Sequence, residues 1–399
     1  MTERPSTNPM DSPAPGAQEK RPSTEAPSPD EGLSGANDGT ADRLPPIQEV
    51  PAAHLNGRVL SGGWKVVRRV GRTLGATGGA FSLQYDVVRE DGAEAFLKAL
   101  NFQSAFAVAG SLVDAMAAFV SAYKFERDLL EECSKRKMSR VIRLLDHGEV
   151  QVPEAGLLER VPYLVLEHAD GDLNAFQATL GHIDLAWVLR TLKHVALGIE
   201  QLHAAQTTHQ DLKPSNVLTL DAGREMKLGD LGRAERKGLS GPNSENQILG
   251  AFAYAPPEQL YGAFGFTWEE RRAGDLYLLG SLGVQLILGN CVTALIQISL
   301  PPAMRATTWG GDYASVLPYL NCAHADVMQR FRDRVNTLTE TTQISTELTS
   351  AIADMTLPDP SLRGHPLDRR YGASPYSVRR YVSLFNKLTA EAEYRLRRI

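Results

Sequence analysis

The ten residues from His209 to Leu218, His-Gln-Asp-Leu-Lys-Pro-Ser-Asn-Val-Leu, are the most informative stretch of this 399-residue chain. They place an acid (Asp211), a cation (Lys213) and an amide (Asn216) at offsets of two and five, before an apolar pair typical of a strand entering a core. A carboxylate can orient an attacking hydroxyl and accept its proton, an ammonium can screen phosphate charge, and an amide oxygen can help to hold magnesium. The loop therefore predicts phosphoryl transfer.

This run resembles the catalytic loop of the protein kinases, and of the Ser/Thr type in particular, which usually reads His-Arg-Asp-Leu-Lys-Pro-x-Asn. Gln210 stands where that family usually carries arginine. The resemblance implies that Asp211 and Lys213 are catalytic and that Asn216 is a magnesium ligand. It also implies that the protein transfers the γ-phosphoryl group of Mg-ATP to Ser or Thr hydroxyls of protein substrates.

The local patterns predict the order of elements that such a fold requires. Short apolar or alternating runs predict strands at 64–70, 81–88, 95–100, 141–145 and 163–167, with a helical pattern over 103–133. From Leu185 to Leu202 the apolar residues recur at three and four, which predicts one face of a long helix. We therefore expect an α+β, two-lobed kinase-like fold, with a small β-rich N-lobe over 64–167 and a larger helical C-lobe over 171–370.

Two upstream elements match the nucleotide-binding parts of that family. Lys98 ends the run Ala-Phe-Leu-Lys, similar to the strand whose lysine holds the α- and β-phosphates. Glu126 is the candidate partner that fixes the direction of this lysine. Asp128, Glu131 and Glu132 are rivals, but the apolar neighbours Phe125, Leu129 and Leu130 favour Glu126.

The glycine loop is a looser match, because Gly75, Gly78 and Gly79 do not follow the usual spacing. Glycines still let backbone N–H groups approach phosphates, so we expect these three to bind ATP, in a register that the sequence does not define.

The run from Leu164 to Asp172 resembles the hinge between the lobes. The resemblance implies that adenine bonds to backbone near Glu167 and Ala169, with Leu166 behind it, and that Asp172 binds the ribose. Farther along, Asp230 in Asp-Leu-Gly lies fourteen residues after Asn216 and matches the magnesium-binding Asp-Phe-Gly.

Two more acidic residues have predicted structural roles. Glu258, in Ala-Pro-Pro-Glu, resembles the end of an activation segment and is expected to pair with Arg363. Asp275 is expected to cap the backbone of the catalytic loop from the start of a central helix. That helix explains why residues 276–300 carry no charge: a buried core helix is favoured over a membrane span.

Composition limits the remaining possibilities. The net charge of −5 argues against a general nucleic-acid binder, and the three separated cysteines form neither a disulfide framework nor a metal site. With no basic-then-apolar leader, a cytoplasmic setting is expected.

The two ends of the chain differ from its centre. Residues 1–60, with no aromatic residue and many prolines, predict a disordered Pro/Ser-rich tail. Residues 301–349 fit no family pattern and are interpreted as a helical insertion. A basic C-terminal helical extension is predicted within 375–399, and a solvated face is favoured over a site for an acidic partner.

Three classes of function remain open: an active Ser/Thr protein kinase, a nucleotide-binding pseudokinase scaffold, and a small-molecule phosphotransferase. The complete set of expected polar residues favours the first over the second. Lys213 and the Pro257-Glu258 pair favour it over the third. Gln210 cannot pair with a phosphate on Ser240 or Ser244, and an alanine replaces the usual threonine after Gly250. Either the enzyme is active at a modest rate without segment phosphorylation, which is favoured, or a partner orders the segment.

Overall fold

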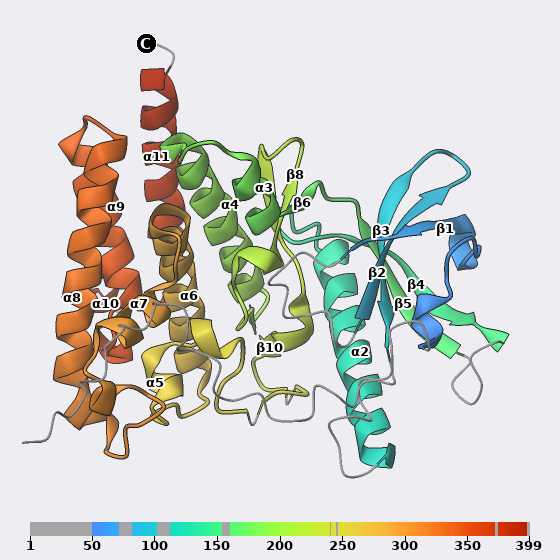
Figure 1. Ribbon diagram of the computed structural model, residues 1–399, viewed down its shortest axis with the longest axis horizontal. Coiled ribbons are helices and arrows are strands. Elements are labelled where there is room, and N and C mark those ends of the chain that lie inside the picture. The colour runs from blue at the N-terminus through green and yellow to red at the C-terminus, as the bar shows by residue number, and fades with distance from the viewer. Residues whose placement is uncertain are drawn as a thin grey trace, which may run out of the picture. The chain divides into compact units, whose positions relative to one another are not determined.

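We analysed a computed structural model of the chain, shown in Figure 1, which describes residues 50–71, 82–101, 112–153, 160–239, 241–244, 246–371 and 374–396. All of them belong to one compact unit, Leu44–Ile399. The predicted α+β architecture in two lobes is confirmed, because the strands of the main sheet and one helix form the first lobe and the remaining helices form the second.

The N-lobe is a five-stranded antiparallel sheet in the order β1-β2-β3-β5-β4. Its strands are β1 Trp64–Arg69, β2 Ser82–Arg89, β3 Glu94–Leu100, β4 Leu144–Gln151 and β5 Arg160–Glu167. In β3, Ala95, Leu97 and Ala99 are completely buried in the core of this lobe. Because side chains alternate along a strand, Phe96 and Lys98 point to the opposite face, where the cavity described below lies.

The predicted disordered tail of residues 1–60 was wrong at its C-terminal end. Short 3-10 turns form at η3 Pro51–Ala53 and η4 Ser61–Gly63. Apolar side chains of this segment, which are Val50, Ala52, Leu55 and Leu60, are buried in the same cluster as Trp64 and Tyr85. Burial of these aliphatic groups offsets the entropy lost when the segment becomes ordered. The prediction failed because it relied on the lack of aromatic residues. Residues 1–49 lie outside the described residues.

The strand predicted at 141–145 was also misplaced, because β4 begins at Leu144. Val141 instead forms an isolated bridge with Leu228, and the N–H of Ile142 donates to the carbonyl of Leu228 at 2.8 Å. In return, the Leu228 N–H donates to the carbonyl of Arg140 at 2.8 Å. The segment before β4 therefore joins the two lobes.

Helix α2 Leu112–Lys135 belongs to the N-lobe and carries Glu126, Leu129 and Leu130 on its buried side. In Figure 1 it lies beside the sheet and faces the second lobe. The first nine residues of the helical pattern predicted from 103 lie outside the described residues.

Small sheets position the catalytic segments of the C-lobe. One contains β6 Gly171–Asp172, β8 Val217–Leu220 and β9 Glu225–Leu228, and the other pairs β7 Thr207–Thr208 with β10 Glu235–Arg236. Short 3-10 turns follow Asp211 at η6 Pro214–Asn216 and Asp230 at η7 Leu231–Arg233.

The C-lobe is built around two long helices, α4 Leu185–Ala204 and α6 Trp268–Leu288. A capping box between Thr267 and Glu270 begins α6, and Gly289 ends it with a φ of 79°, a left-handed conformation that glycine adopts without strain. The buried core helix predicted from residue 276 is therefore confirmed, although it stops at Leu288.

No single helix among the described residues is long and apolar enough to cross a membrane. Helices α6 and α7 Val292–Ser299 would pass together by length and composition, but they meet at a bend of 75°.

Further helices complete this lobe: α3 Leu173–Thr179, α5 Pro257–Leu260, α8 Tyr313–Leu338, α9 Thr342–Thr356, α10 Pro366–Arg370 and α11 Arg379–Leu396. Turns lie at η8 Phe252–Tyr254, η9 Pro302–Met304 and η10 Pro360–Leu362. The interpretation of 301–349 as helical holds for η9, α8 and the start of α9. In Figure 1, α11 runs alongside α4. Its cations pair within the chain, as in Arg379–Glu200 and Lys387–Glu347.

Candidate active site

The catalytic loop is held by hydrogen bonds to the buried carboxylate of Asp275 on α6. Its two oxygens accept from the N–H of His209 at 2.9 Å and from the N–H of Gln210 at 2.8 Å. His203 Nε2 lies 2.8 Å from the same carboxylate. These bonds offset the cost of the left-handed backbone at Gln210, whose φ is 63°. The capping role predicted for Asp275 is therefore confirmed, and the loop is held at its base.

Asp211 is oriented by three donors. Lys213 Nζ donates to Asp211 Oδ2 at 2.9 Å, and Asn216 Nδ2 donates to the same oxygen at 3.0 Å and to the Asp211 carbonyl at 2.8 Å. The backbone N–H of Ala251 donates to Oδ1 at 2.9 Å. Since the side chains of Asp211, Lys213 and Asn216 are all buried, this geometry is well defined. The loop therefore presents one carboxylate beside one ammonium, as its sequence predicts.

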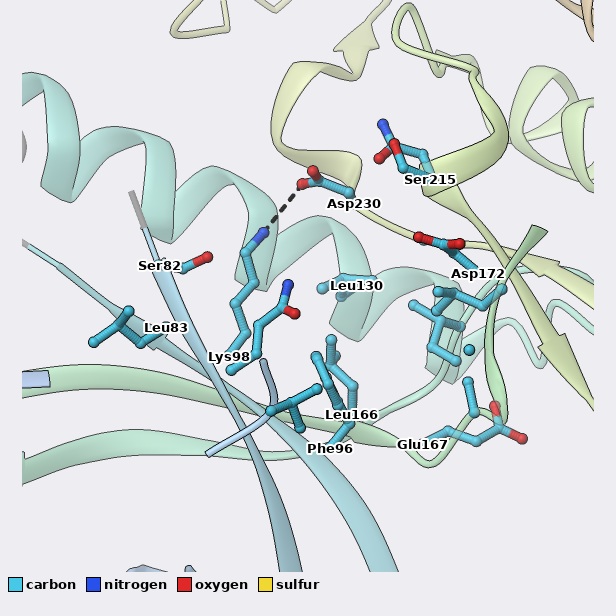
Figure 2. Close-up of a pocket in the computed structure, with 18 of the residues that line it drawn as sticks. Ser82, Leu83, Phe96, Lys98, Leu130, Leu166, Glu167, Asp172, Ser215 and Asp230 are labelled. Atoms are coloured by element: carbon cyan, nitrogen blue, oxygen red, sulfur yellow. Dashed lines mark hydrogen bonds and ion pairs between the residues drawn. The ribbon is translucent and has the colours of Figure 1, made fainter. Parts of the chain in front are cut away.

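Lys98 forms a partly buried ion triad with Glu126 and Asp230, whose side chain is 39% exposed. Its Nζ lies 2.8 and 3.0 Å from the two oxygens of Glu126 and 3.0 Å from Asp230 Oδ1. Figure 2 shows the lysine extending from β3 toward Asp230, with the bond between them dashed. Three elements far apart in sequence, β3, α2 and the turn before η7, meet at this point.

Lys98 and Asp230 keep their charges, whereas burial raises the pKa of Glu126 and the Lys98 ammonium opposes this. Burial alone would lower the pKa of Lys98, but the carboxylates of Asp230 and Glu126 outweigh burial and raise it. The adjacent Lys98 ammonium lowers the pKa of Asp230, and burial opposes this in part. A cation and a carboxylate therefore face the cavity at neutral pH.

The cavity between the lobes has a volume of about 220 Å³. Its apolar end is lined by Phe96, Leu130, Ile142, Leu166 and Leu218, and its polar end by Lys98, Glu126, Asn216 and Asp230. One apolar end and one charged end match a ligand with a planar base and a phosphate chain. Asp211 does not line this cavity but is joined to it through Asn216.

The predicted hinge residues Glu167, Ala169 and Asp172 line the cavity. The Glu167 carboxylate is held by Lys227 Nζ at 2.6 and 2.7 Å, which ties the end of β5 to β9. Asp172 caps α3 by accepting from the Ala175 N–H at 2.8 Å. Both side chains are thus fixed before any ligand binds. The glycine-loop residues Gly75, Gly78 and Gly79 lie outside the described residues.

The residues predicted to bind magnesium suit that ion. Both Asn216 and Asp230 line the cavity and offer the oxygen ligands that Mg²⁺ prefers. The Asn216 amide nitrogen is committed to Asp211, which leaves its oxygen for other partners. No cluster of three or more His, Cys, Asp or Glu that could hold a metal exists in the part of the chain the structure describes. Remaining ligands would have to come from phosphate oxygens and water.

Glu258 and Arg363 form the predicted pair through two bonds of 2.8 Å. The side chains are 2% and 0% exposed, so the bidentate geometry is needed to offset their desolvation. Arg363 also donates to the Ala273 carbonyl at 3.0 Å, which connects α5, α6 and η10. This pair fixes the end of the activation segment.

Some residues at the site were not predicted from the sequence. The Ala251 N–H bonds to Asp211 through the backbone alone, and Lys227 bonds to Glu167, 60 residues away in the chain. Gln210 was expected only to lack a charge, yet its amide donates to the Arg271 carbonyl at 2.8 Å and to Asp275 at 2.9 Å. No local sequence pattern indicates these partners, because they lie on α6, 61 and 65 residues away in the chain.

The comparisons with known proteins agree with this geometry. The family described as "Protein kinase domain" matches residues 71–301. Serine/threonine-protein kinase PknA of Mycobacterium tuberculosis (strain ATCC 25618 / H37Rv) is 30% identical over 146 residues, or 36% of this chain and 32% of that protein.

Two other relatives have similar sequence identity to this chain. Serine/threonine-protein kinase PknL of the same strain is 31% identical over 151 residues, or 38% of this chain and 36% of that protein. A probable cyclin-dependent kinase 8 of Dictyostelium discoideum is 32% identical over 177 residues, or 42% and 43%. The chain thus spans between about a third and two fifths of the length of these relatives. Because the family match covers more than half of the chain, and the catalytic loop, the ion triad and the Glu258–Arg363 pair are in place, this protein belongs to the protein kinase domain family.

Proposed function

We propose that this protein is a Ser/Thr protein kinase that transfers the γ-phosphoryl group of Mg-ATP to hydroxyl groups of protein substrates. The observation that carries the proposal is the ion triad of Lys98, Glu126 and Asp230 at the charged end of one cavity, next to the Asp211 loop. A chain that had lost catalysis would be expected to lack at least one of these groups, and none is missing. The similarity to named Ser/Thr kinases supports the same activity.

The residues that line the cavity have separate roles in binding the nucleotide. The apolar end of the cavity receives the base, and Lys98, directed by Glu126, binds phosphate oxygens. Magnesium, when bound at Asn216 and Asp230, neutralises charge on the phosphates. Each of these contacts positions the nucleotide before reaction, which is where most catalysis of phosphoryl transfer originates.

Asp211 orients the attacking hydroxyl. The hydroxyl oxygen forms a bond to the γ-phosphorus as the bond to the β,γ-bridging oxygen breaks, and the hydroxyl proton passes to the Asp211 carboxylate. Lys213, 2.9 Å from that carboxylate, places a positive charge beside the transferred group. ADP leaves with the bridging oxygen.

We further propose that activity does not depend on phosphorylation of the activation segment. Gln210 is neutral and buried, and its side-chain N–H groups are already used by Arg271 and Asp275. It therefore offers nothing to a phosphate. The segment already reaches Asp211 through the Ala251 N–H without any modification.

The decisive experiment uses purified full-length protein, labelled ATP, a mixture of acceptor proteins and a panel of small hydroxylated compounds. We expect label in protein Ser or Thr, and a loss of about 100-fold or more with Asp211→Asn, which keeps the shape of the side chain but removes the base. Label in a small compound would favour a phosphotransferase. No label despite magnesium-dependent ATP binding would favour a scaffold. Treatment with phosphatase beforehand tests the second proposal, since a tenfold fall in activity would contradict it.

A further inference from the structure

A largely buried polar cluster joins the activation segment, the stretch from Asp230 to Glu258, to helix α6. It consists of Glu235 on β10 and Ser244, both in the segment, and Arg271 on α6. Ser244 Oγ donates to Glu235 Oε2 at 2.7 Å, and Arg271 Nη2 donates to the Ser244 carbonyl at 3.0 Å. Arg271 Nη1 lies 3.8 Å from Glu235 Oε2. The side chains of Arg271 and Glu235 are only 9% and 2% exposed, so this is an internal cluster and not a surface ion pair.

Arg271 contacts the catalytic loop, and Glu235 contacts the residue just before it. Glu235 pairs with Thr208 in the β10–β7 ladder, and Thr208 directly precedes the loop. The carbonyl of Arg271 accepts from the side chain of Gln210, the residue before Asp211. The cluster is therefore hydrogen-bonded to Thr208 and to Gln210, which precede Asp211 by three residues and by one.

The segment leads from the cluster back to the catalytic aspartate. Beyond Ser244, Gln247 Nε2 donates to the Gln259 carbonyl at 3.1 Å, and the Leu249 N–H lies 3.4 Å from Gln259 Oε1. The chain then reaches Ala251, whose N–H donates to Asp211. A shift of the segment at Ser244 would thus be transmitted to a group that orients the base.

Burial makes the two charges depend on each other. Burial raises the pKa of Glu235 and lowers that of Arg271, and in each case the opposite charge counteracts burial. Within the part of the chain that the structure describes, neither Glu235 Oε1 nor Arg271 Nη1 has a hydrogen-bond partner. Removing one charge would leave the other buried without compensation, which is the costly case for an internal ion pair.

We propose that Arg271 is a positioning residue that, with Glu235 and Ser244, holds the unmodified activation segment against Asp211. A carboxylate built into β10 and a guanidinium from α6 thereby do the ordering that a phosphate on the segment would otherwise do. The proposal deepens the phosphorylation independence proposed above and rests on it, but the contacts that it names exist whether or not the chain transfers phosphate.

The test compares Arg271→Met with Arg272→Met in the full-length protein. Arg272 is the next residue of α6 and is also largely buried, but it bonds to Glu269 and Ser374, away from the segment. For Arg271→Met we expect kcat for a protein acceptor to fall by about tenfold or more, with the dissociation constant of ATP changed by less than about twofold. Hydrogen exchange at the Ala251 amide is expected to accelerate about tenfold in this variant. The control variant Arg272→Met is expected to leave both kcat and this exchange rate nearly unchanged.

A double variant separates positioning from a simple loss of stability. In Glu235→Gln combined with Arg271→Met no buried charge is stranded, so its melting temperature is expected to exceed that of Arg271→Met while kcat stays low. Arg271→Lys, which keeps the charge but loses the forked donor, serves if the methionine variant does not fold, with the same direction expected for exchange and kcat.

Equal losses in the two arginine variants, or unchanged exchange at Ala251 in the Arg271 variants, would overturn the proposal. Exchange is measured without catalysis, so it still tests the cluster if the parent protein shows no transfer.

Discussion

Gly250 is the position where a single added carbon would disturb catalysis most directly. A Cβ at this residue would lie 2.6 Å from the Gln210 carbonyl oxygen and 2.8 Å from Asp211 Oδ1. Both distances are shorter than side-chain carbons tolerate, and two of the neighbouring atoms, the Gln210 oxygen and Asp211 Cα, belong to the backbone. Gly250→Ala must therefore push the segment and the catalytic loop apart.

The size of the effect follows from these contacts. Restoring ordinary contact to the Gln210 oxygen requires a separation of about 3.4 Å, so the two segments must move apart by roughly 0.8 Å. The 2.9 Å bond from the Ala251 N–H to Asp211 would then be lost or badly stretched. A hydrogen bond to a charged group contributes about 1.5 to 3 kcal/mol, and a misplacement near 1 Å can cost about 100-fold in rate. We expect kcat to fall by about 100-fold.

The assay is steady-state transfer to a protein acceptor, with ATP affinity measured separately by calorimetry. Gly250 does not line the nucleotide cavity, so affinity is expected to stay within about twofold of the parent protein. Gly181→Ala is the matched control, because a Cβ there would meet nothing within 4 Å. A kcat within about threefold of the parent value, in a folded Gly250→Ala protein, would refute the idea that this close approach orients the base.

Other predictions concern the metal, a titrating carboxyl and the N-terminal segment. Asp230→Asn is expected to weaken ATP binding in the presence of magnesium more than in its absence; metal-independent affinity in the parent protein would contradict the site. Lys98→Met is expected to reduce transfer by about 100-fold, measured with the same acceptor, because it removes the phosphate-binding cation. Burial raises the pKa of Asp354 from 3.8 to about 6, so the folded state disfavours its charged form and this cost is fully present above pH 6. Asp354→Asn is therefore expected to stabilise the protein by about 2 to 3 kcal/mol at pH 8, with a gain that shrinks as the pH falls toward 4, and urea unfolding at several pH values would check it. Deleting residues 1–49 is expected to leave the melting temperature nearly unchanged. Deleting 1–60 removes the buried Leu55 and Leu60 and is expected to cost about 3 to 6 kcal/mol; equal melting temperatures would show that the segment contributes nothing.

The parts of the site that the sequence predicted are local or follow from helix geometry. Asp211, Lys213 and Asn216 share one short loop, so their spacing already implies their proximity. Glu126 could be chosen over its rivals because helix periodicity places it on the same side as buried leucines, and the structure agrees: Glu131 pairs with Lys135 instead.

The parts that the sequence did not predict depend on contacts between distant segments or on the backbone. Arg271 lies 61 residues from Gln210 in the chain, and the sequence around neither residue indicates that they form a hydrogen bond. The Ala251 N–H has no side-chain signature at all. The buried segment before Trp64 was missed because a few aliphatic residues among prolines resemble a solvated tail in composition. In each case the information resides in packing that forms only when the chain is folded.

The contact between the segment before β4 and β9 has a consequence for how nucleotide leaves. The backbone bonds of Ile142 and Leu228, and the ion pair of Glu167 with Lys227, attach the first lobe to the second beside the connecting chain. Lys98 on β3 and Glu132 on α2 also bond to Asp230 and Arg236 of the second lobe, so β3 and α2 are held while β1 and β2 lie at the far edge of the sheet. The cavity is therefore expected to open most at the edge formed by β1 and β2, farthest from the attachment. The rate of ADP departure would then depend on how readily those two strands tilt, and much less on any separation of the lobes as a whole.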